Sequence, residues 1–150
     1  MKQEISKSSQ KGLVIYADDD TDDLFLVSEG FFAYAPNIDL ITVRDGLELF
    51  ECLSVLEAQG KTPCLIVLDI NMPRLDGKST LRRLRQSERY DDVPVVLFST
   101  SSANGDKSFA HAHNAGFITK PRVFTDMSPI IEQFFKQCTD EVHRHAKLIQ

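Results

Sequence analysis

The sequence has few cysteines, and they lack the spacing of a zinc site or a disulfide framework. Only three occur in 150 residues, Cys52, Cys64 and Cys138, and none lies in a C-x-x-C arrangement. A disulfide framework needs paired cysteines, and a structural zinc site needs closely spaced ones. We therefore expect buried free thiols.

Long apolar runs are also missing. No stretch reaches the roughly 18 apolar residues that a membrane-spanning helix requires. The first residues, MKQEISKSSQKG, are polar and contain no apolar signal segment. These absences predict a cytoplasmic protein that has no membrane partner.

The chain has no excess of positive charge. Its formal net charge is −5 and its pI is about 5.3. Proteins that bind nucleic acid without sequence preference depend on a positive field around the molecule. Direct contact with nucleic acid is therefore not predicted.

What remains is the composition of a packed globular domain, with 42% hydrophobic and 26% charged residues. A chain of this length fits one domain, and we see no internal repeat or low-complexity linker that would divide it. We expect a polar leader at 1–11, one domain at 12–138, and a tail or helix extension at 139–150. That tail is too short to be an output domain.

Short apolar runs alternate with amphipathic stretches about five times along the chain. The runs are short enough to be strands and too uniformly apolar to have one wet face, so they predict a buried parallel sheet. They are Leu13–Ala17, Leu40–Val43, Cys64–Leu68, Val95–Phe98 and Phe117–Thr119.

The stretches between these runs show helical periodicity. The clearest lies at the C-terminal end, where apolar residues fall on one stripe of a 3.6-residue helix. They are Met127, Ile130, Ile131, Phe134, Phe135 and Cys138. A second stripe is formed by Leu47, Phe50, Leu53 and Leu56. The class is therefore α/β.

Acidic, hydroxyl and basic residues follow the predicted strands where the strands end. In an open parallel sheet these carboxyl ends share one edge, where ligands bind. We expect the residues after four of the strands to share this rim. They are Asp18-Asp19-Asp20, Asp69-Ile70-Asn71, Ser99-Thr100 and Lys120-Pro121.

The carboxylates of this rim would repel one another. Two unit charges about 4 Å apart interact by about 4 kcal/mol at an effective dielectric near 20. Oxygen ligands that leave room for water and a phosphoryl oxygen suit Mg²⁺, and Lys120 would add a further positive charge. Because a carboxylate can accept a phosphoryl group covalently, the pattern favours phosphoryl transfer.

Two other patterns in the sequence could in principle bind a metal ion. Asp18, Asp20, Asp22 and Glu29 match positions 1, 3, 5 and 12 of an EF-hand loop, but Asp23 replaces the glycine that its turn requires. The H-x-H pairs at 111–113 and 143–145 could bind metal on a strand. On a helix they would not share a face, so surface histidines are favoured.

The polar residues of the rim resemble those of the receiver domain of two-component response regulators. The motifs, in chain order, are Asp18-Asp19-Asp20, Val67-Leu68-Asp69-Ile70-Asn71-Met72-Pro73 with Asp76-Gly77, Ser99, and Thr119-Lys120-Pro121. The spacing is family-like, since Asp69 follows Asp18 by 51 residues and Lys120 follows Asp69 by 51. The resemblance covers residues 12–138 and implies a doubly wound, five-stranded parallel sheet, the flavodoxin-like (βα)5 fold.

The resemblance also implies a role for individual residues. Asp69 would be the phosphoacceptor, and Lys120 would pair with the phosphoryl group. The peptide bond between Lys120 and Pro121 would be cis. Ser99 would donate its hydroxyl, although a one-residue shift would select Thr100 instead. Phe117 would be the switch aromatic.

A divalent ion is implied at the same place. The resemblance makes Asp19 and Asp69 side-chain ligands of Mg²⁺, Asn71 a ligand through its backbone carbonyl, and Asp18 a ligand through a bound water. The Asp69 carboxylate would then accept the phosphoryl group next to the ion.

The function implied is that of a stand-alone response regulator, of the chemotaxis-regulator-like or phytochrome-regulator-like type. A sensor histidine kinase or phosphotransfer protein would phosphorylate it, and the fourth helix, fifth strand and fifth helix would bind a downstream protein. Beyond self-phosphorylation and self-dephosphorylation it would not be an enzyme.

Two alternatives stay open at this point. The first is an aspartate-nucleophile phosphatase of the haloacid-dehalogenase type, although Asp18 and Asp20 are followed by Asp22 where that pattern has Thr or Val. The second is a degenerate receiver that only binds proteins.

Overall fold

Strands and helices alternate throughout the computed structural model of the chain, which describes residues 12–137. Its strands are β1 (Gly12–Ala17), β2 (Ile38–Val43), β3 (Leu65–Leu68), β4 (Val95–Ser99) and β5 (Gly116–Thr119). They form one sheet in the order β2-β1-β3-β4-β5, and every neighbouring pair is parallel. The predicted parallel sheet is confirmed.

The β2 strand begins two residues earlier than the apolar run predicted. It lies at one edge of the sheet, and of its residues only Val43 is buried. Asp39 interrupts the apolar pattern near its start, yet the residue still pairs with Leu13 of β1. An edge strand tolerates this polar residue because one side of it is not covered by another strand.

The helices are α2 (Thr21–Tyr34), α3 (Gly46–Ala58), α4 (Gly77–Arg85), α5 (Asn104–Ala112) and a final helix over 128–137. Aspartate side chains cap the first three. Asp20 accepts from the backbone N–H groups of Asp22 and Asp23, Asp45 from Glu48, and Asp76 from Ser79. Capping by aspartate satisfies backbone donors that a helix start leaves without partners. Ala103, which precedes α5, provides no such bond.

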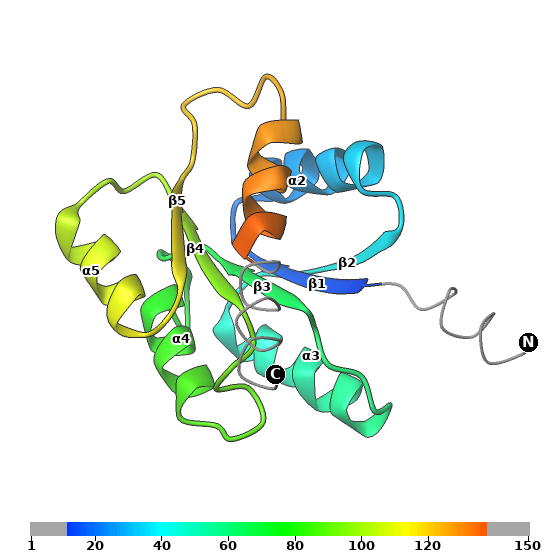
Figure 1. Cartoon of the computed structure of the whole chain (residues 1–150), viewed down its shortest axis with the longest axis vertical. Coiled ribbons are helices and arrows are strands. Elements are labelled where there is room, and N and C mark those ends of the chain that lie inside the picture. The colour runs from blue at the N-terminus through cyan, green and yellow to red at the C-terminus, as the bar shows by residue number, and fades with distance from the viewer. Residues whose placement is uncertain (1–11, 138–150) are drawn as a thin grey trace, which may run out of the picture.

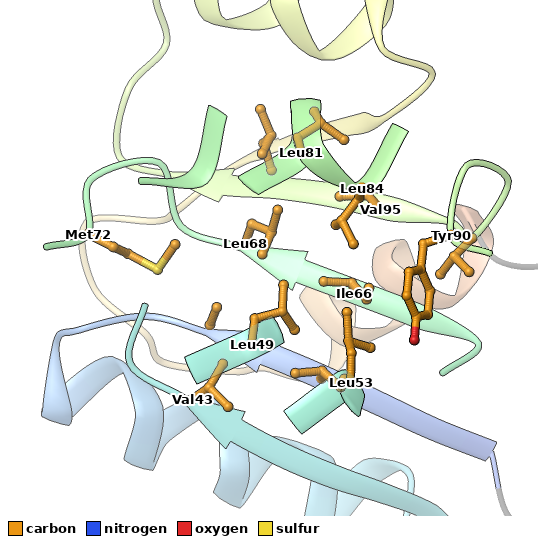
Figure 2. Close-up of a cluster of buried hydrophobic side chains, with 14 of the residues drawn as sticks. Val43, Leu49, Leu53, Ile66, Leu68, Met72, Leu81, Leu84, Tyr90 and Val95 are labelled. Carbon is orange, nitrogen blue, oxygen red and sulfur yellow. The ribbon is translucent and has the colours of Figure 1, made fainter. Parts of the chain in front are cut away.

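Helices cover both faces of the sheet (Figure 1). The α2 helix and the final helix pack on one face, where Phe31 and Phe134 stack at 6.3 Å between ring centroids. On the other face, α3 and α4 place Leu53 and Leu81 over β3, as Figure 2 shows. This is the doubly wound arrangement, with one core on each face.

The stripe of α3 that faces the core differs from the predicted one. Leu49, Leu53 and Leu56 are buried, whereas Leu47 is partly exposed. Both stripes contain Leu53 and Leu56, and the packing of α3 on the sheet selects the one with Leu49 (Figure 2). Full burial of one leucine side chain contributes about 2 kcal/mol, so this choice of face is strongly favoured.

The final helix confirms the clearest helical prediction. Ile130, Ile131 and Phe134 of its stripe are buried against the sheet. Cys138, the leader 1–11, the tail 139–150 and the pair His143 and His145 lie outside the described residues. Within 12–137, no helix has the length and apolar character needed to cross a bilayer.

Candidate functional site

The carboxyl ends of the strands bring the predicted rim together. Asp18 follows β1 and Asp69 follows β3, and these two strands are neighbours in the sheet. The backbone N–H of Asp69 donates to the carbonyl oxygen of Ala17 at 2.9 Å, which extends the ladder to the rim. The two acidic turns therefore lie side by side.

Three carboxylates form one cluster at this rim. Asp18, Asp19 and Asp69 each offer an oxygen atom within 4.8 Å of the others. Asp18 is fully buried, Asp69 is 8% exposed and Asp19 is exposed. Among residues 12–137 this is the one group of three or more acidic, histidine or cysteine side chains with that geometry.

The cluster raises the pKa of Asp69 to about 7, compared with 3.8 for an ordinary aspartate. Burial is the largest cause, and the negative charge of Asp18 adds to it, while Lys120 acts in the opposite direction. A carboxylate in this setting lacks sufficient positive charge around it. The site therefore favours an added cation.

Lys120 is the positive side chain of the rim. Its Nζ donates to Asp18 Oδ2 at 2.6 Å and to Asp23 Oδ2 at 2.8 Å, and it lies 3.6 Å from Asp69 Oδ2. Burial disfavours the ammonium, but the hydrogen bonds to Asp18 and Asp23 outweigh burial, so the pKa of Lys120 is raised. Lys120 stays charged at neutral pH.

Tyr16 makes a contact with Asp18 that the sequence did not reveal. Its fully buried hydroxyl donates to Asp18 Oδ2 at 2.5 Å, the oxygen atom that also accepts from Lys120. Burial, followed by the charge of Asp18, raises the pKa of the phenol far above its usual value. Tyr16 therefore remains a donor and fixes the orientation of Asp18.

Asp23 is a second residue whose contact was not predicted from the sequence. Asp20 does cap α2. The Asp23 side chain instead turns inward to Lys120. The signal that could have found it is its spacing, because the third residue of a helix points back toward the preceding strand end.

The two candidate hydroxyls differ in position. Ser99 is the last residue of β4 and is buried, and its Oγ accepts from the N–H of Ser101 at 3.2 Å. Thr100 is exposed and borders a cavity that Lys120 and Asp23 also line. The structure places Ser99 in the sheet and Thr100 in the loop beyond it.

Asn71 and Phe117 lie at the edges of this region. Asn71 is exposed in the loop after β3. Phe117 lies in β5, pairs with Leu97 of β4, and packs half-buried against the core beneath α3, α4 and α5. Their roles as a carbonyl ligand and a switch aromatic stay predictions.

The predicted cis bond before Pro121 is wrong for this structure. Residues 12–137 contain no cis peptide bond, so the Lys120–Pro121 bond is trans. Proline lowers the cost of a cis bond, but the trans form remains favoured by about 0.5–1 kcal/mol. The trans bond still directs Lys120 into the acidic cluster.

The loop after β3 is held against the start of α4 by a close backbone contact. The N–H of Gly77 donates to the carbonyl oxygen of Ile70 at 2.8 Å. A Cβ atom at Gly77 would lie 2.1 Å from the carbonyl oxygen of Asp69. Only glycine permits this approach, which fixes the backbone that carries Asp69.

The structure does not support an EF-hand loop or a metal site at the H-x-H pair 111–113. A strand, β1, precedes the acidic run, where an EF-hand would have a helix. His111 lies on α5, and His113 follows that helix and stacks on Phe109 at 4.2 Å between ring centroids. The H-x-H pair at 111–113 is therefore not on a strand.

The site fits a hard divalent cation. All three members of the cluster are carboxylates, and oxygen is the donor that Mg²⁺ and Mn²⁺ prefer. Lys120 supplies one positive charge to Asp18, Asp23 and Asp69, so negative charge exceeds positive charge. Burial and, after it, the negative charge of Asp18 raise the pKa of Asp69.

Residues 14–132 match the family model described as the response regulator receiver domain. The response regulator Rcp1 of Synechocystis sp. is 28% identical over 132 residues, which are 84% of this chain and 88% of Rcp1.

Solved structures give the same result. The phosphorylated cyanobacterial phytochrome response regulator RcpA superposes with a TM-score of 0.75 at 26% identity, covering 83% of this chain and 91% of RcpA. The Mn²⁺-bound form of Rcp1 superposes with a TM-score of 0.71 at 27% identity, covering 81% of this chain and 90% of that structure. The flavodoxin-like receiver fold is thereby confirmed.

Proposed function

The chain belongs to the response regulator receiver family, and we propose that it acts as the Mg²⁺-dependent phosphoacceptor of a two-component phosphorelay, with Asp69 as the acceptor. One observation carries this proposal. The Asp69 carboxylate lies 3.6 Å from the ammonium of Lys120 and within 4.8 Å of the Asp18 and Asp19 carboxylates. The proposed acceptor, the ammonium of Lys120 and a cluster with an excess of negative charge thus lie together.

In the proposed reaction, an oxygen atom of Asp69 bonds to the phosphorus of a phosphohistidine donor. The phosphorus–nitrogen bond breaks, and the imidazole nitrogen keeps its electron pair. Lys120 stabilises the charge on the phosphoryl oxygens, and the Ser99 hydroxyl donates to one of them. Hydrolysis of the acyl phosphate returns Asp69 to a carboxylate, so the chain modifies itself and turns over no other substrate.

The donor set fits Mg²⁺, with Asp19 and Asp69 as side-chain ligands and the carbonyl of Asn71 as a third. Asp18 would act through a water, since its Oδ2 already accepts from Tyr16 and Lys120. When bound, the ion neutralises charge on the phosphoryl oxygens. A solved structure of Rcp1 in a Mn²⁺-bound form supports the binding of a divalent ion.

We propose that a sensor histidine kinase or a phosphotransfer protein supplies the phosphoryl group. The surface formed by α5, β5 and the final helix would then bind a downstream protein, with Phe117 reporting the state of Asp69. The family and the phytochrome regulator RcpA support this assignment. The location in the cytoplasm stays a prediction.

Phosphorylation with a small donor tests the proposal. Incubation of the chain with acetyl phosphate and Mg²⁺ should add one phosphoryl group, and mass spectrometry of the hydroxylamine-treated or borohydride-reduced protein should map it to Asp69. A label on Asp18 together with hydrolysis of phosphate esters would support the dehalogenase-type alternative. No label at millimolar Mg²⁺ would support a degenerate receiver.

Mg²⁺ should raise the melting temperature of the unphosphorylated chain. Only the folded chain assembles the three carboxylates, so binding stabilises it by about 2.7 kcal/mol at 100 times Kd. The shift should be larger at pH 8 than at pH 6, because a proton competes with the ion for Asp69, whose pKa is about 7. Thermal unfolding by circular dichroism, with NaCl at matched ionic strength as the control, measures this. A flat response up to tens of millimolar would contradict it.

A further inference from the structure

Asp23 and Lys120 form an ion pair that brings the first turn of α2 to the rim. Lys120 Nζ lies 2.8 Å from Asp23 Oδ2 but 3.6 Å from Asp69 Oδ2. The Asp23 side chain is 21% exposed, and the Lys120 side chain is 5% exposed. The ammonium is therefore held closer to Asp23 than to the proposed acceptor.

The inward direction of Asp23 follows from how α2 begins. An acidic residue at the third position of a helix commonly reaches back to the N–H of the capping residue. Here the N–H of that residue, Asp20, donates to Asp18 Oδ1 at 3.0 Å instead. The Asp23 carboxylate is thus not used for capping, and it binds Lys120.

The contact can be exchanged for another because it borders open space. Asp23 and Lys120 line a cavity together with Thr100, Arg122 and Phe124. On the buried side, the Phe98 ring lies 5.6 Å from Nζ and supports the ammonium. Lys120 can therefore leave Asp23 without disrupting packed side chains, while Asp18 continues to hold it.

We propose that Asp23 is a positioning residue that draws Lys120 away from Asp69 in the unphosphorylated chain, a role that rests on the function proposed above. A phosphoryl group on Asp69 carries more charge than the carboxylate it replaces and attracts Lys120 more strongly. Lys120 then moves from Asp23 to the phosphoryl oxygens. The lost Asp23 contact makes the phosphorylated state less favourable by the same amount.

Replacement of Asp23 by asparagine should therefore favour the phosphorylated state. The variant keeps the size of the side chain but removes the charge that competes for Lys120. A partly exposed ion pair of this kind corresponds to about a fivefold change in an equilibrium constant. Beryllium fluoride, which mimics the phosphoryl group, should bind the D23N chain about fivefold more tightly in the presence of Mg²⁺.

The matched control is Asp22→Asn. Asp22 lies in the same first turn of α2 and is exposed. Its replacement removes the same unit charge and the same favourable interaction with the helix dipole as the change at Asp23. Any difference between the two variants therefore reports the contact with Lys120 and not the net charge.

Isothermal titration of the full chain with beryllium fluoride, at fixed MgCl2, separates the outcomes. Tighter binding by D23N than by D22N supports the proposal, provided that thermal unfolding shows both variants folded. Equal affinities would show that only net charge acts, and weaker binding by D23N would show that Asp23 places Lys120 productively; both results overturn it. If the wild-type chain binds no beryllium fluoride, the function proposed above fails as well.

Discussion

Asp69→Asn should abolish phosphorylation and make the metal-free chain more stable. The variant lacks the carboxylate oxygen that bonds to phosphorus, so acetyl phosphate should leave no acyl phosphate on it. In the metal-free chain, the same change removes a buried negative charge beside Asp18. At pH 8 we expect a gain of about 2 kcal/mol, which is less than the full pKa shift implies because water screens part of the carboxyl group.

The gain should depend on pH. The pKa of Asp69 is about 7 in the folded chain and 3.8 in an ordinary aspartate. Between these pH values Asp69 binds a proton in the folded chain but not in the unfolded chain, so the contribution of Asp69 to the stability of the wild-type chain falls as pH rises from 4 to 7. The difference between the D69N and wild-type chains should therefore be full at pH 8 and disappear near pH 4.

Thermal unfolding in the presence of a chelator measures the difference in stability between the D69N and wild-type chains. A gain of about 2 kcal/mol corresponds to a melting temperature that is higher by about 5 °C. Asp91→Asn is the control, since Asp91 is exposed in the loop before β4. The control should change neither the melting temperature nor the phosphorylation. A lower melting temperature for D69N in chelator at pH 8 would contradict the charge argument.

Gly77→Ala should destabilise the chain and weaken the site at the same time. The new Cβ atom would lie 2.1 Å from the carbonyl oxygen of Asp69 and 2.9 Å from the Cα of Ile70. These are backbone atoms, so no side-chain rotation relieves the overlap, and the loop that carries Asp69 must move. We expect a loss of about 2–3 kcal/mol in the free energy of unfolding.

The movement should also affect Asp69. Because the loop positions this residue next to Lys120, the G77A chain should bind Mg²⁺ more weakly and accept the phosphoryl group from acetyl phosphate more slowly. Denaturant unfolding measures the first effect, and Mg²⁺ titration followed by thermal shift measures the second.

Gly105→Ala provides the comparison for Gly77→Ala. Gly105 is also near the start of a helix, α5, but a Cβ atom there would meet nothing within 4 Å. Alanine in a helix is more stable than glycine by about 0.5–1 kcal/mol, so the G105A chain should be slightly more stable and keep its metal affinity. If both variants behave alike, the backbone contact at Gly77 is not what fixes the loop.

The receiver fold and the place of the acidic cluster could be predicted because they depend on local signals. Buried parallel strands show as apolar runs, and three of the four polar motifs that follow them supply Asp18, Asp69 and Lys120 to one cluster. Parallel strands end at the same edge of a sheet. The sequence order of the motifs was therefore enough to bring the three residues together.

The buried stripe of α3 was predicted only in part, because Leu47 was grouped with Leu53 and Leu56 in place of Leu49. Leu49, Leu53 and Leu56 fall at i, i+4 and i+7, whereas Leu47 lies six and nine residues before Leu53 and Leu56 and therefore on another side of the helix. The orientation of the helix on the sheet buries Leu49 and leaves Leu47 partly exposed. The spacing of Leu49 was therefore a local signal that could have identified the buried stripe.

The sequence by itself determined the class of fold, the edge of the sheet that carries the chemistry, and the carboxylates and lysine that meet there. Only the tertiary structure decided that Tyr16 and Asp23 contact Asp18 and Lys120, and that the bond to Pro121 is trans. The physical reason is that these features depend on how the folded chain packs and orients its side chains and backbone. Periodicity and strand ends are encoded by neighbouring residues, whereas the hydrogen bonds that orient each charge join residues up to 102 positions apart and depend on side-chain geometry.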